Sequence, residues 1–401
     1  MKPKSSGAPR LVTLVLLTGL SVLSMNMFVP SLPNMAVDFG VDYALVNFAI
    51  VGYLAVTAFL QIILGPLSDR YGRRPVLIWG LAIFSVASLG CALAEDIYLF
   101  LAFRIAQGAI VSGAAISRAV VRDTSGPQEA AGLIAYIGMA MAIAPMLGPM
   151  VGGVLDDLFG WRAGFWAYTG FGFVLLAICW VDLKETNRYL GSTFADQVAA
   201  YPELFRSRRF WGYAICLSFS IGGFYVFISG APLVATLVLN IGPGELGLYM
   251  GTITAGFFVG SFISGRIAPK FKLTTMMITG RVVACTGLTL ALLLVAGGAV
   301  NVLTVFGSVV FVGLGNGLSS PSANAGVLSV RPQLAGSASG LSGAMIVGAG
   351  AILSSVTGGL LIDTNAPAVM IGLLLACSVA GLLAALYVLW VDQRDPLPPV
   401  D

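Results

Sequence analysis

The stretch GPLSDRYGRRP, residues 65–75, places one carboxylate and three arginines in a short interval with a glycine near each end. Apolar sequence surrounds it, with VGYLAVTAFLQIIL before Gly65 and VLIWGLAIFSVASLGCALA after Pro75. Only 10% of the 401 residues are charged, so such a cluster stands out within its own chain. This pattern predicts a short polar loop between two long apolar helices.

The composition places the chain among membrane proteins. Hydrophobic residues make up 58% of it, whereas a soluble domain has roughly 45–50% apolar and about 25% charged residues. The apolar runs are continuous and rich in Leu, Ala and Gly, and each is long enough for the roughly 20 residues that a bilayer-spanning helix needs. A β-barrel would instead show short alternating segments. The sequence therefore predicts an all-α membrane protein.

We expect twelve membrane-spanning helices, and the distribution of Lys and Arg orients them. The spans are predicted to begin near Arg10, Ala44, Val76, Ile97, Ala131, Ala163, Trp211, Leu246, Met276, Val302, Gly336 and Ala368. With the N-terminus inside, the basic residues of the loops gather on the inner side and Arg162 alone falls in an outer loop. This predicts a multi-pass membrane protein with both termini in the cytoplasm, and the resemblance described below implies the bacterial inner membrane.

The chain is predicted to consist of two similar halves. A polar interruption, KETNRYLGSTFADQVAAYPELFRSRRF, follows the sixth span from Lys184. We therefore expect a six-helix bundle over residues 1–183, a cytoplasmic linker over 184–209 and a second six-helix bundle over 210–401. Motifs repeat between the halves: GGVLDD from Gly152 resembles GGLLID from Gly358. Internal duplication is typical of secondary transporters, which bind substrate between the halves near the membrane midplane.

Several classes of function are disfavoured by what the sequence contains. There is no histidine and no Gly-x-x-x-x-Gly-Lys-Ser/Thr phosphate loop. The cysteines all fall inside apolar runs, which predicts buried thiols rather than disulfides or metal ligands: Cys91, Cys179, Cys216, Cys285 and Cys377. We expect neither an enzyme nor a bound cofactor or metal. The expected partners are a small-molecule substrate, protons and lipid, with no nucleic acid, and the expected state is a monomer.

The charged loop that opened this section is interpreted as a conformational latch. Gly65 and Gly72 allow tight turns, and Asp69 can face a helix N-terminus or an arginine. The remaining residues assigned to the latch are Arg73, Arg118, Arg122 and Asp123. Anchoring by the positive-inside rule is the alternative, which explains the arginines but not the Gly-x-x-x-Asp-x-x-Gly frame. Arg118 can also snorkel to the inner interface.

These motifs together resemble the major facilitator superfamily over nearly the whole chain. GPLSDRYGRRP is similar to the loop signature of the superfamily, and RIAQG from Arg104 resembles its span-four motif. APMLGPMVGG from Ala144 resembles the span-five motif of its proton antiporters, and NMFVPSLP from Asn26 the span-one motif of its drug exporters. VVRDTSG and GWRAGFW are similar to the bicyclomycin/chloramphenicol-resistance (Bcr/CflA) and EmrD-like exporters. The resemblance implies two pseudo-symmetric six-helix bundles and drug:proton antiport.

Arg104 is the candidate for proton coupling. It lies about a third of the way into the fourth predicted span, where a charge costs roughly 2.5–3.5 kcal/mol to insert, so it should face a polar cavity or a partner. Gln107 follows one turn later and can share that face. The resemblance implies a role for both residues in coupling. The alternative is a structural arginine that donates to backbone carbonyls.

Asn26 departs from the pattern of the drug exporters, which often carry an acid at this position. An amide cannot titrate, and no Asp or Glu falls at the centre of any predicted span. The nearest acids are Asp38, Asp156, Asp157, Asp182 and Asp363. Either a peripheral carboxylate works together with Arg104, or the protein is not coupled to protons. Asn26 can bind substrate or join two helices.

The fifth span and a set of aromatic and amide residues complete the predicted site. Proline bends a helix and glycine permits close approach, and the resemblance implies gating by Pro145, Gly148, Pro149, Gly152 and Gly153. An aromatic pocket with few polar groups suits lipophilic drugs. The substrate candidates are Asn26, Tyr53, Gln61, Tyr136, Phe224, Phe227 and Asn316. For each aromatic residue, simple packing or lipid contact is the alternative.

The predicted function is export of small amphipathic or lipophilic, antibiotic-like compounds by alternating access, in exchange for protons. Two alternatives remain open from the sequence. One is an exporter or symporter of a metabolite or sugar, and the other is a non-transporting sensor built on the same fold.

Overall fold

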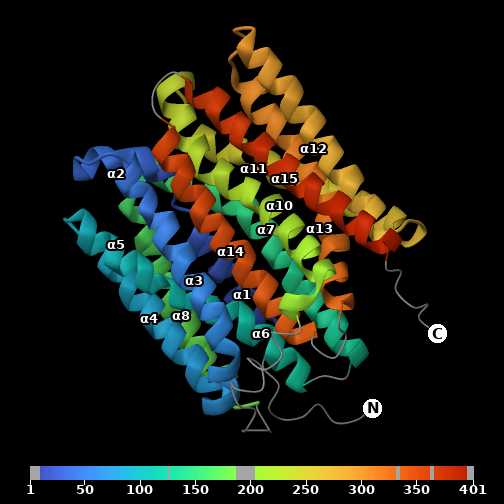
Figure 1. Ribbon diagram of the computed structural model, residues 1–401. Coiled ribbons are helices and arrows are strands. Elements are labelled where there is room, and N and C mark those ends of the chain that lie inside the picture. The colour runs from blue at the N-terminus through green and yellow to red at the C-terminus, as the bar shows by residue number, and fades with distance from the viewer. Residues whose placement is uncertain (1–9, 125–126, 187–203, 331–334, 362–364, 395–401) are drawn as a thin grey trace. The chain divides into compact units, whose positions relative to one another are not determined.

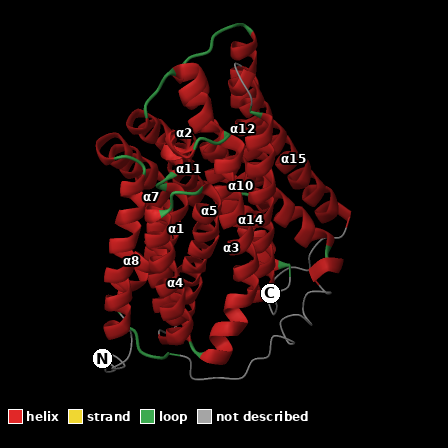
Figure 2. Ribbon diagram, turned by 90° about the vertical axis from the view of Figure 1, so that its left-hand side faces the viewer, coloured by secondary structure: helices red, strands yellow, loops and turns green. Residues whose placement is uncertain are grey.

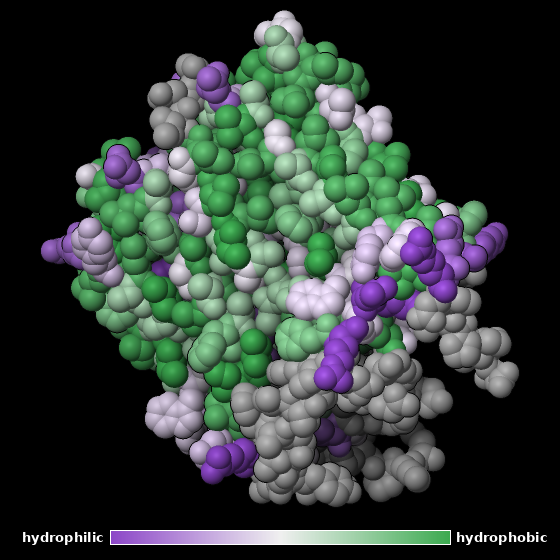
Figure 3. Space-filling view, viewed as in Figure 1, coloured by the Kyte–Doolittle hydropathy of each residue, from purple (hydrophilic) through white to green (hydrophobic). Residues whose placement is uncertain are grey.

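A computed structural model describes residues 10–124, 127–186, 204–330, 335–361 and 365–394, and in this part of the chain every regular element is a helix (Figures 1 and 2). This confirms the predicted all-α class. Large apolar side chains remain on the outside of the helices, among them Phe59, Trp79, Val181, Phe258 and Leu293. Apolar side chains dominate the face shown in Figure 3, as expected of helices that pack against lipid.

Packing divides the described residues into two units, each with its own core. Residues 242–248 belong to the first unit together with α1 to α8. The elements up to α8 are α1 (Leu11–Asn26), η1 (Val29–Ser31), α2 (Leu32–Phe39), α3 (Tyr43–Tyr71), α4 (Arg73–Leu93), α5 (Ile97–Ala106), η2 (Gln107–Ile110), α6 (Val111–Thr124), α7 (Pro127–Phe159) and α8 (Arg162–Asp182).

The second unit contains α10, η3, most of α11 and everything that follows. Its elements are α10 (Arg208–Val234), η3 (Ala235–Leu239), α11 (Pro243–Ile267), η4 (Ala268–Lys270), α12 (Leu273–Ala296), η5 (Leu303–Gly307), α13 (Ser308–Ser329), α14 (Ala335–Leu360) and α15 (Ala366–Arg394). The predicted bounds of 1–183, 184–209 and 210–401 stay a prediction, and α10 begins at Arg208, inside the predicted linker.

Within the described residues, eleven helical segments are long and apolar enough to cross a membrane. The 33-residue α7 lies where the sequence predicts the fifth span, and its side chains are described only in part. Every predicted span begins within four residues of a helix start in the structure. Hydropathy locates these starts well because the polar loops between long apolar runs are short.

The core of each unit comes from a few helix pairs. In the first unit α1 packs on α6, α7 and α8, while α4 packs on α5 and α8. Aromatic side chains fill this core, where Phe100, Trp161 and Phe165 meet edge to face. In the second unit α10 packs on α13, α14 and α15, and α12 packs on α13 and α15.

Two spans of the first unit are interrupted in their interior. The first span stops as an α-helix at Asn26, makes a single 3₁₀ turn at Val29–Ser31 and resumes as α2. Pro30 falls in this turn and Pro33 is the second residue of α2, and neither can donate the backbone bond that would continue the first helix. The fourth span tightens to 3₁₀ geometry at Gln107–Ile110, between α5 and α6. Interior breaks leave carbonyl oxygens free for side-chain donors.

The turn between α3 and α4 depends on Gly72. Its φ of 98° and ψ of 154° lie in a region that is essentially restricted to glycine. A Cβ at this position would also collide with the carboxylate of Glu185. The glycine that the sequence places in this loop is therefore required by both backbone and packing.

Replacing Gly72 with alanine is expected to lower the free energy of unfolding by about 1–3 kcal/mol, because alanine is strained in this backbone region. Gly170→Ala is the matched control, since a Cβ there meets nothing within 4 Å. The measurement is thermal unfolding followed with a thiol-reactive dye, which reports exposure of the buried cysteines Cys91, Cys179, Cys216 and Cys377. Equal stability of the two variants would contradict the assignment.

Candidate functional site

Arg104, near the end of α5, is completely buried at the centre of the first unit. Its Nη1 donates to Oε1 of Gln107 at 2.6 Å, and its Nη2 donates to the carbonyl oxygen of Ser24 at 2.7 Å. Ser24 lies in the last turn of α1, just before the interruption, so its carbonyl is open to a side-chain donor. The guanidinium also lies 4.2 Å from the ring centre of Phe28 and 4.3 Å from that of Tyr53.

Further hydrogen bonds fix the partners of Arg104. The Nε2 of Gln107 donates to the hydroxyl of Ser88 on α4 at 2.7 Å, and Ser88 donates to the carbonyl of Phe84 at 2.7 Å. The hydroxyls of Ser24 and Tyr53 are 2.7 Å apart. The structure thus brings together Arg104, Gln107 and Tyr53, three residues that the sequence analysis assigned to the site.

The charge of Arg104 is balanced by neutral groups. In the described residues, no carboxylate forms an ion pair with it, and its Nε is buried without a hydrogen-bond partner. A carbonyl, an amide and two π faces stabilise the cation in place of an acid, and desolvated cation–π contacts contribute about 2 kcal/mol each. This arrangement keeps a permanent positive charge beside the break in the first span.

Asn26 closes the last turn of α1 and is buried. Its Nδ2 donates to the carbonyl of Val22 at 2.8 Å, within the same helix, and its Oδ1 is buried without a partner. A Cβ built on Gly148 of α7 would lie 3.4 Å from the Asn26 Cβ. The amide therefore offers one open acceptor where α1 meets α7.

The glycines of α7 fit closely against the interrupted first span. A Cβ at Gly152 would overlap the carbonyl oxygen of Met27, in the break itself. On another side of α7, a Cβ at Gly153 would overlap the backbone of Pro243, in the segment 242–248 of the same unit. Pro145 and Pro149 both lie inside the helix. The five prolines and glycines that were predicted to gate thus all belong to α7, which is closely packed at Gly152 and Gly153. Their gating role stays a prediction.

Asp156 is the one carboxylate that is buried in the described part of the chain, with 7% of its surface exposed. It lies one turn after Gly152 on α7, and its Oδ2 accepts from Nδ2 of Asn34 at 3.0 Å. The hydroxyl of Ser31 is a second neutral donor. Neither contact supplies a positive charge, and Asn34 and Ser31 both belong to the segment that follows the break.

The other acids named from the sequence have different surroundings. Asp38 pairs with Arg162 at 2.5 Å at the surface, and Asp182 accepts from the hydroxyl of Thr13 at 2.6 Å. Asp157 is exposed, and Asp363 lies outside the described residues. Asp156 therefore differs from them in combining burial with contacts to neutral donors.

The predicted latch is in part visible at the turn between α3 and α4. Arg73 forms an ion pair with Asp123 of α6 at 3.1 Å and donates to the hydroxyl of Ser68 at 2.5 Å. Arg118 is half-buried on α6. The surroundings of Gly65 and the side chains of Asp69 and Arg122 are outside those that the structure describes, so the contacts predicted for Asp69 stay a prediction.

Glu185 is a residue of this cluster that the sequence analysis missed. Its Oε1 and Oε2 accept the backbone N–H groups of Arg73 at 3.0 Å and Arg74 at 3.2 Å, which caps the N-terminus of α4. A carboxylate at a helix N-terminus is stabilised by the helix dipole. Glu185 falls in the predicted linker, 112 residues after Arg73, and no local pattern indicates this pairing.

The remaining substrate candidates fall into separate groups in the two units. Gln61 is half-buried on α3, in the same unit as Asn26 and Tyr53, whereas the Tyr136 side chain is outside the described set. In the second unit Phe224 is half-buried on α10, and Phe227 is buried with its ring edge-on to that of Phe306.

Asn316, also buried, accepts a hydrogen bond from Arg281 at 2.6 Å. Arg281 was missed in the sequence, although a lone arginine inside the apolar run MMITGRVVACTG is the same signal that identified Arg104.

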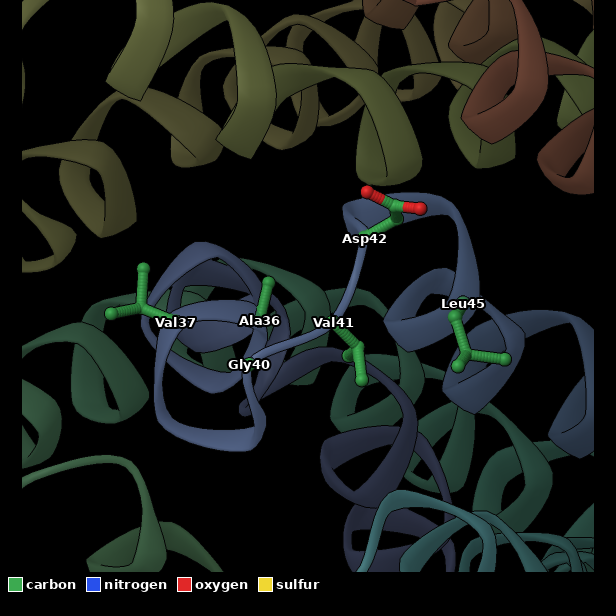
Figure 4. Close-up of a pocket in the computed structure, with 6 residues that line it drawn as sticks. All are labelled: Ala36, Val37, Gly40, Val41, Asp42 and Leu45. Atoms are coloured by element: carbon green, nitrogen blue, oxygen red, sulfur yellow. The ribbon is translucent and has the colours of Figure 1, made fainter.

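A surface pocket lies at the turn between α2 and α3 (Figure 4). Ala36 and Val37 of α2 and Leu45 of α3 line it together with Gly40, Val41 and Asp42 of the turn. It contains none of the predicted substrate residues. We therefore locate the candidate site in the interior of the first unit, around Arg104 and Asn26.

Comparison with known proteins identifies relatives along the whole chain. The profile of a family described as the Major Facilitator Superfamily matches residues 14–355. A chloramphenicol resistance protein of Pseudomonas aeruginosa is 30% identical, over 90% of this chain and 87% of its own. Multidrug resistance protein MdtL of Escherichia coli O45:K1 (strain S88 / ExPEC) is 29% identical over 91% of each chain.

Among solved structures, a bacterial homologue of the human lysosomal transporter Spinster superposes with a TM-score of 0.76 at 17% identity, and all of each chain is covered. At this level of identity the likeness concerns the fold.

The contact between Gly152 and the Met27 carbonyl yields a test of the α7 packing. Gly152→Ala is expected to lower the free energy of unfolding by about 1–3 kcal/mol, because its Cβ has to displace backbone. Gly148→Ala, one turn away on α7, introduces an ordinary contact at 3.4 Å and is expected to be tolerated. Thermal unfolding in detergent measures both, and a reversed order would contradict the packing.

Proposed function

This chain belongs to the major facilitator superfamily, and on that basis we propose that it exports small amphipathic or lipophilic, antibiotic-like compounds by alternating access, in exchange for protons. It is a multi-pass membrane transporter by family and by its apolar helices. The proposal that the transported compounds are drugs rests on one observation. Relatives that align over nine-tenths of the chain are named for chloramphenicol and multidrug resistance.

We place the transporter in the bacterial inner membrane as a monomer, with both termini in the cytoplasm. The Lys and Arg residues support this orientation, because almost all of those in loops fall on one side of the predicted spans. The neutral, aromatic surroundings of Arg104 and the open acceptor on Asn26 support a lipophilic cargo that carries a few polar groups.

For the proton we propose Asp156 as the carrier, with Arg104 as the fixed charge of the same unit. A buried carboxylate without a cationic partner is costly when ionised, and protonation removes that cost. Among the described side chains, the hydrogen bonds of Asp156 are with neutral donors of the segment that follows the break, and Gly152, one turn earlier, packs on the break. Protonation at Asp156 would therefore act on the same part of the first span that supplies the Ser24 carbonyl to Arg104.

Arg104→Lys is expected to abolish most chloramphenicol export although it retains the charge. A lysine ammonium lacks the planar fork that reaches Gln107 and Ser24 while stacking between two rings. The measurement is drug accumulation in a host that lacks its own exporters, with thermal unfolding as a check of folding. Arg206→Lys, at an exposed arginine, is the control. Unchanged export by Arg104→Lys would show that transport does not need the planar guanidinium of Arg104.

Asp156→Asn is expected to eliminate drug-dependent proton movement, because an amide cannot carry a proton. The measurement is the change in internal pH of everted vesicles when chloramphenicol is added. The neighbouring exposed carboxylate provides the matched control, Asp157→Asn, which should still move protons. Proton movement that persists in Asp156→Asn would assign coupling to another group, and its absence in the wild type would contradict antiport.

A further inference from the structure

The second unit contains a buried arginine that the proposed export mechanism has not used. Arg281 of α12 is 1% exposed. Its Nη2 donates to Oδ1 of Asn316 at 2.6 Å and to the hydroxyl of Ser319 at 2.8 Å, both on α13. Each of these contacts is neutral.

Glycines bring the two helices close enough for these contacts. A Cβ on Gly280 would collide with the carbonyl oxygen of Gly315, and a Cβ on Gly315 would collide with that of Gly280. The backbones of α12 and α13 therefore touch where Arg281 and Asn316 follow these two glycines. The position of the guanidinium is thus fixed by the crossing of the helices.

Two more helices of the same unit border the arginine. A Cβ at Gly381 of α15 would lie 3.0 Å from Cδ of Arg281 and 3.8 Å from the hydroxyl oxygen of Ser220 on α10. The Nε of Arg281 is buried without a hydrogen-bond partner, and the hydroxyl of Ser220 lies within reach of the Cys216 thiol. One unsatisfied donor of the guanidinium and one hydroxyl thus both border Gly381.

Among the residues that the structure describes, no acid balances the charge of Arg281. In the described part of the second unit the only carboxylate is Asp392, which pairs with Arg209 at 2.9 Å. Arg104 is stabilised by two aromatic rings, whereas in the described residues no ring is stacked on Arg281. A buried, unpaired cation is among the most costly features a protein can carry, and an anion that reached it would remove this cost.

We propose that Arg281, Asn316, Ser319 and Ser220 form an anion-binding subsite that takes an acidic group, such as a carboxylate or sulfonate, of the transported compound. The Nε of Arg281 supplies a donor that remains unused, the Ser220 hydroxyl can turn from the Cys216 thiol to an acid, and charge-assisted hydrogen bonds to a guanidinium are the stronger kind. The assignment of this group to the cargo rests on the proposed export function. Since Arg281 is closed off in this structure, the group enters in another conformation of the transport cycle.

The test uses two fluorescent probes with one aromatic core, 8-anilinonaphthalene-1-sulfonate and N-phenyl-1-naphthylamine, of which only the first carries a sulfonate. Binding is measured on the full-length protein in nanodiscs, with empty nanodiscs subtracted. Arg281→Gln is expected to weaken sulfonate binding about tenfold while binding of the neutral probe stays the same. Arg281→Lys should retain part of the sulfonate affinity. Arg266→Gln, which removes an exposed arginine from the same unit, is the matched control.

Equal weakening of both probes in Arg281→Gln would assign the arginine a structural role and overturn the subsite, as would unchanged sulfonate binding. A second experiment, competition against the sulfonate probe, uses only the wild type, so its outcome does not depend on the folding of a variant. Benzoate should displace the sulfonate probe, and benzamide, its neutral analogue, should not. If chloride displaced the sulfonate probe as effectively as benzoate does, the subsite would bind a free inorganic anion. That result would overturn the proposal that it binds an acidic group of the transported compound.

Export of chloramphenicol, which is neutral, separates this inference from the proposed function. The wild type should export it if the proposed function is correct, and this outcome does not depend on Arg281. Loss of sulfonate binding in Arg281→Gln with unchanged binding of the neutral probe supports the subsite, whereas a wild type that binds the sulfonate but exports nothing contradicts the proposed function alone.

Discussion

A positive charge buried among lipid-embedded helices must be balanced, and in the first unit neutral groups alone do this for Arg104. The guanidinium needs the carbonyl of Ser24, the amide of Gln107 and the rings of Phe28 and Tyr53 at the same time. These groups come from the first, second and fourth spans, and Ser88 extends the network to the third. The break in the first span is part of this solution, because an intact helix would use the Ser24 carbonyl itself.

The second unit buries a charge by a different arrangement. Arg281 relies on the direct contact of two helix backbones at Gly280 and Gly315, which leaves room for an amide and a hydroxyl but provides no aromatic face. Small residues are what membrane helices use to approach closely. The two units therefore share a type of residue, a buried arginine, while differing in how completely its donors are satisfied.

The sequence predicts the fold far better than the site. Long apolar runs locate the spans, because helix formation in lipid is nearly obligatory and the loops are short. The hydropathy of these runs does not indicate where a span is interrupted, and Pro30 within Asn26–Ser31 is the sequence signal that marks the break. Arg104 and Gln107 could be paired from their spacing on one helix, and Asp156 could be named as a candidate acid.

Contacts between distant segments could not be predicted in this way. Glu185 caps a helix that begins 112 residues earlier, and the tyrosine that stacks on Arg104 comes from a different span. Such pairs depend on which faces of the helices meet, and hydropathy is nearly uniform around these spans. The environment of Asp156 likewise depends on the path of the chain after the break, which places Asn34 beside α7.

The spacing of the glycines on α7 limits how that helix can slide. Gly152 faces the carbonyl of Met27 without room for a side chain, and Gly148 precedes it by one helical turn. At a rise of about 1.5 Å per residue, a displacement of about 6 Å along the axis, with a rotation of about 40°, would bring Gly148 to the place of Gly152. The Met27 carbonyl would then again face a glycine, so the spacing of these two glycines matches a shift of α7 by about one turn.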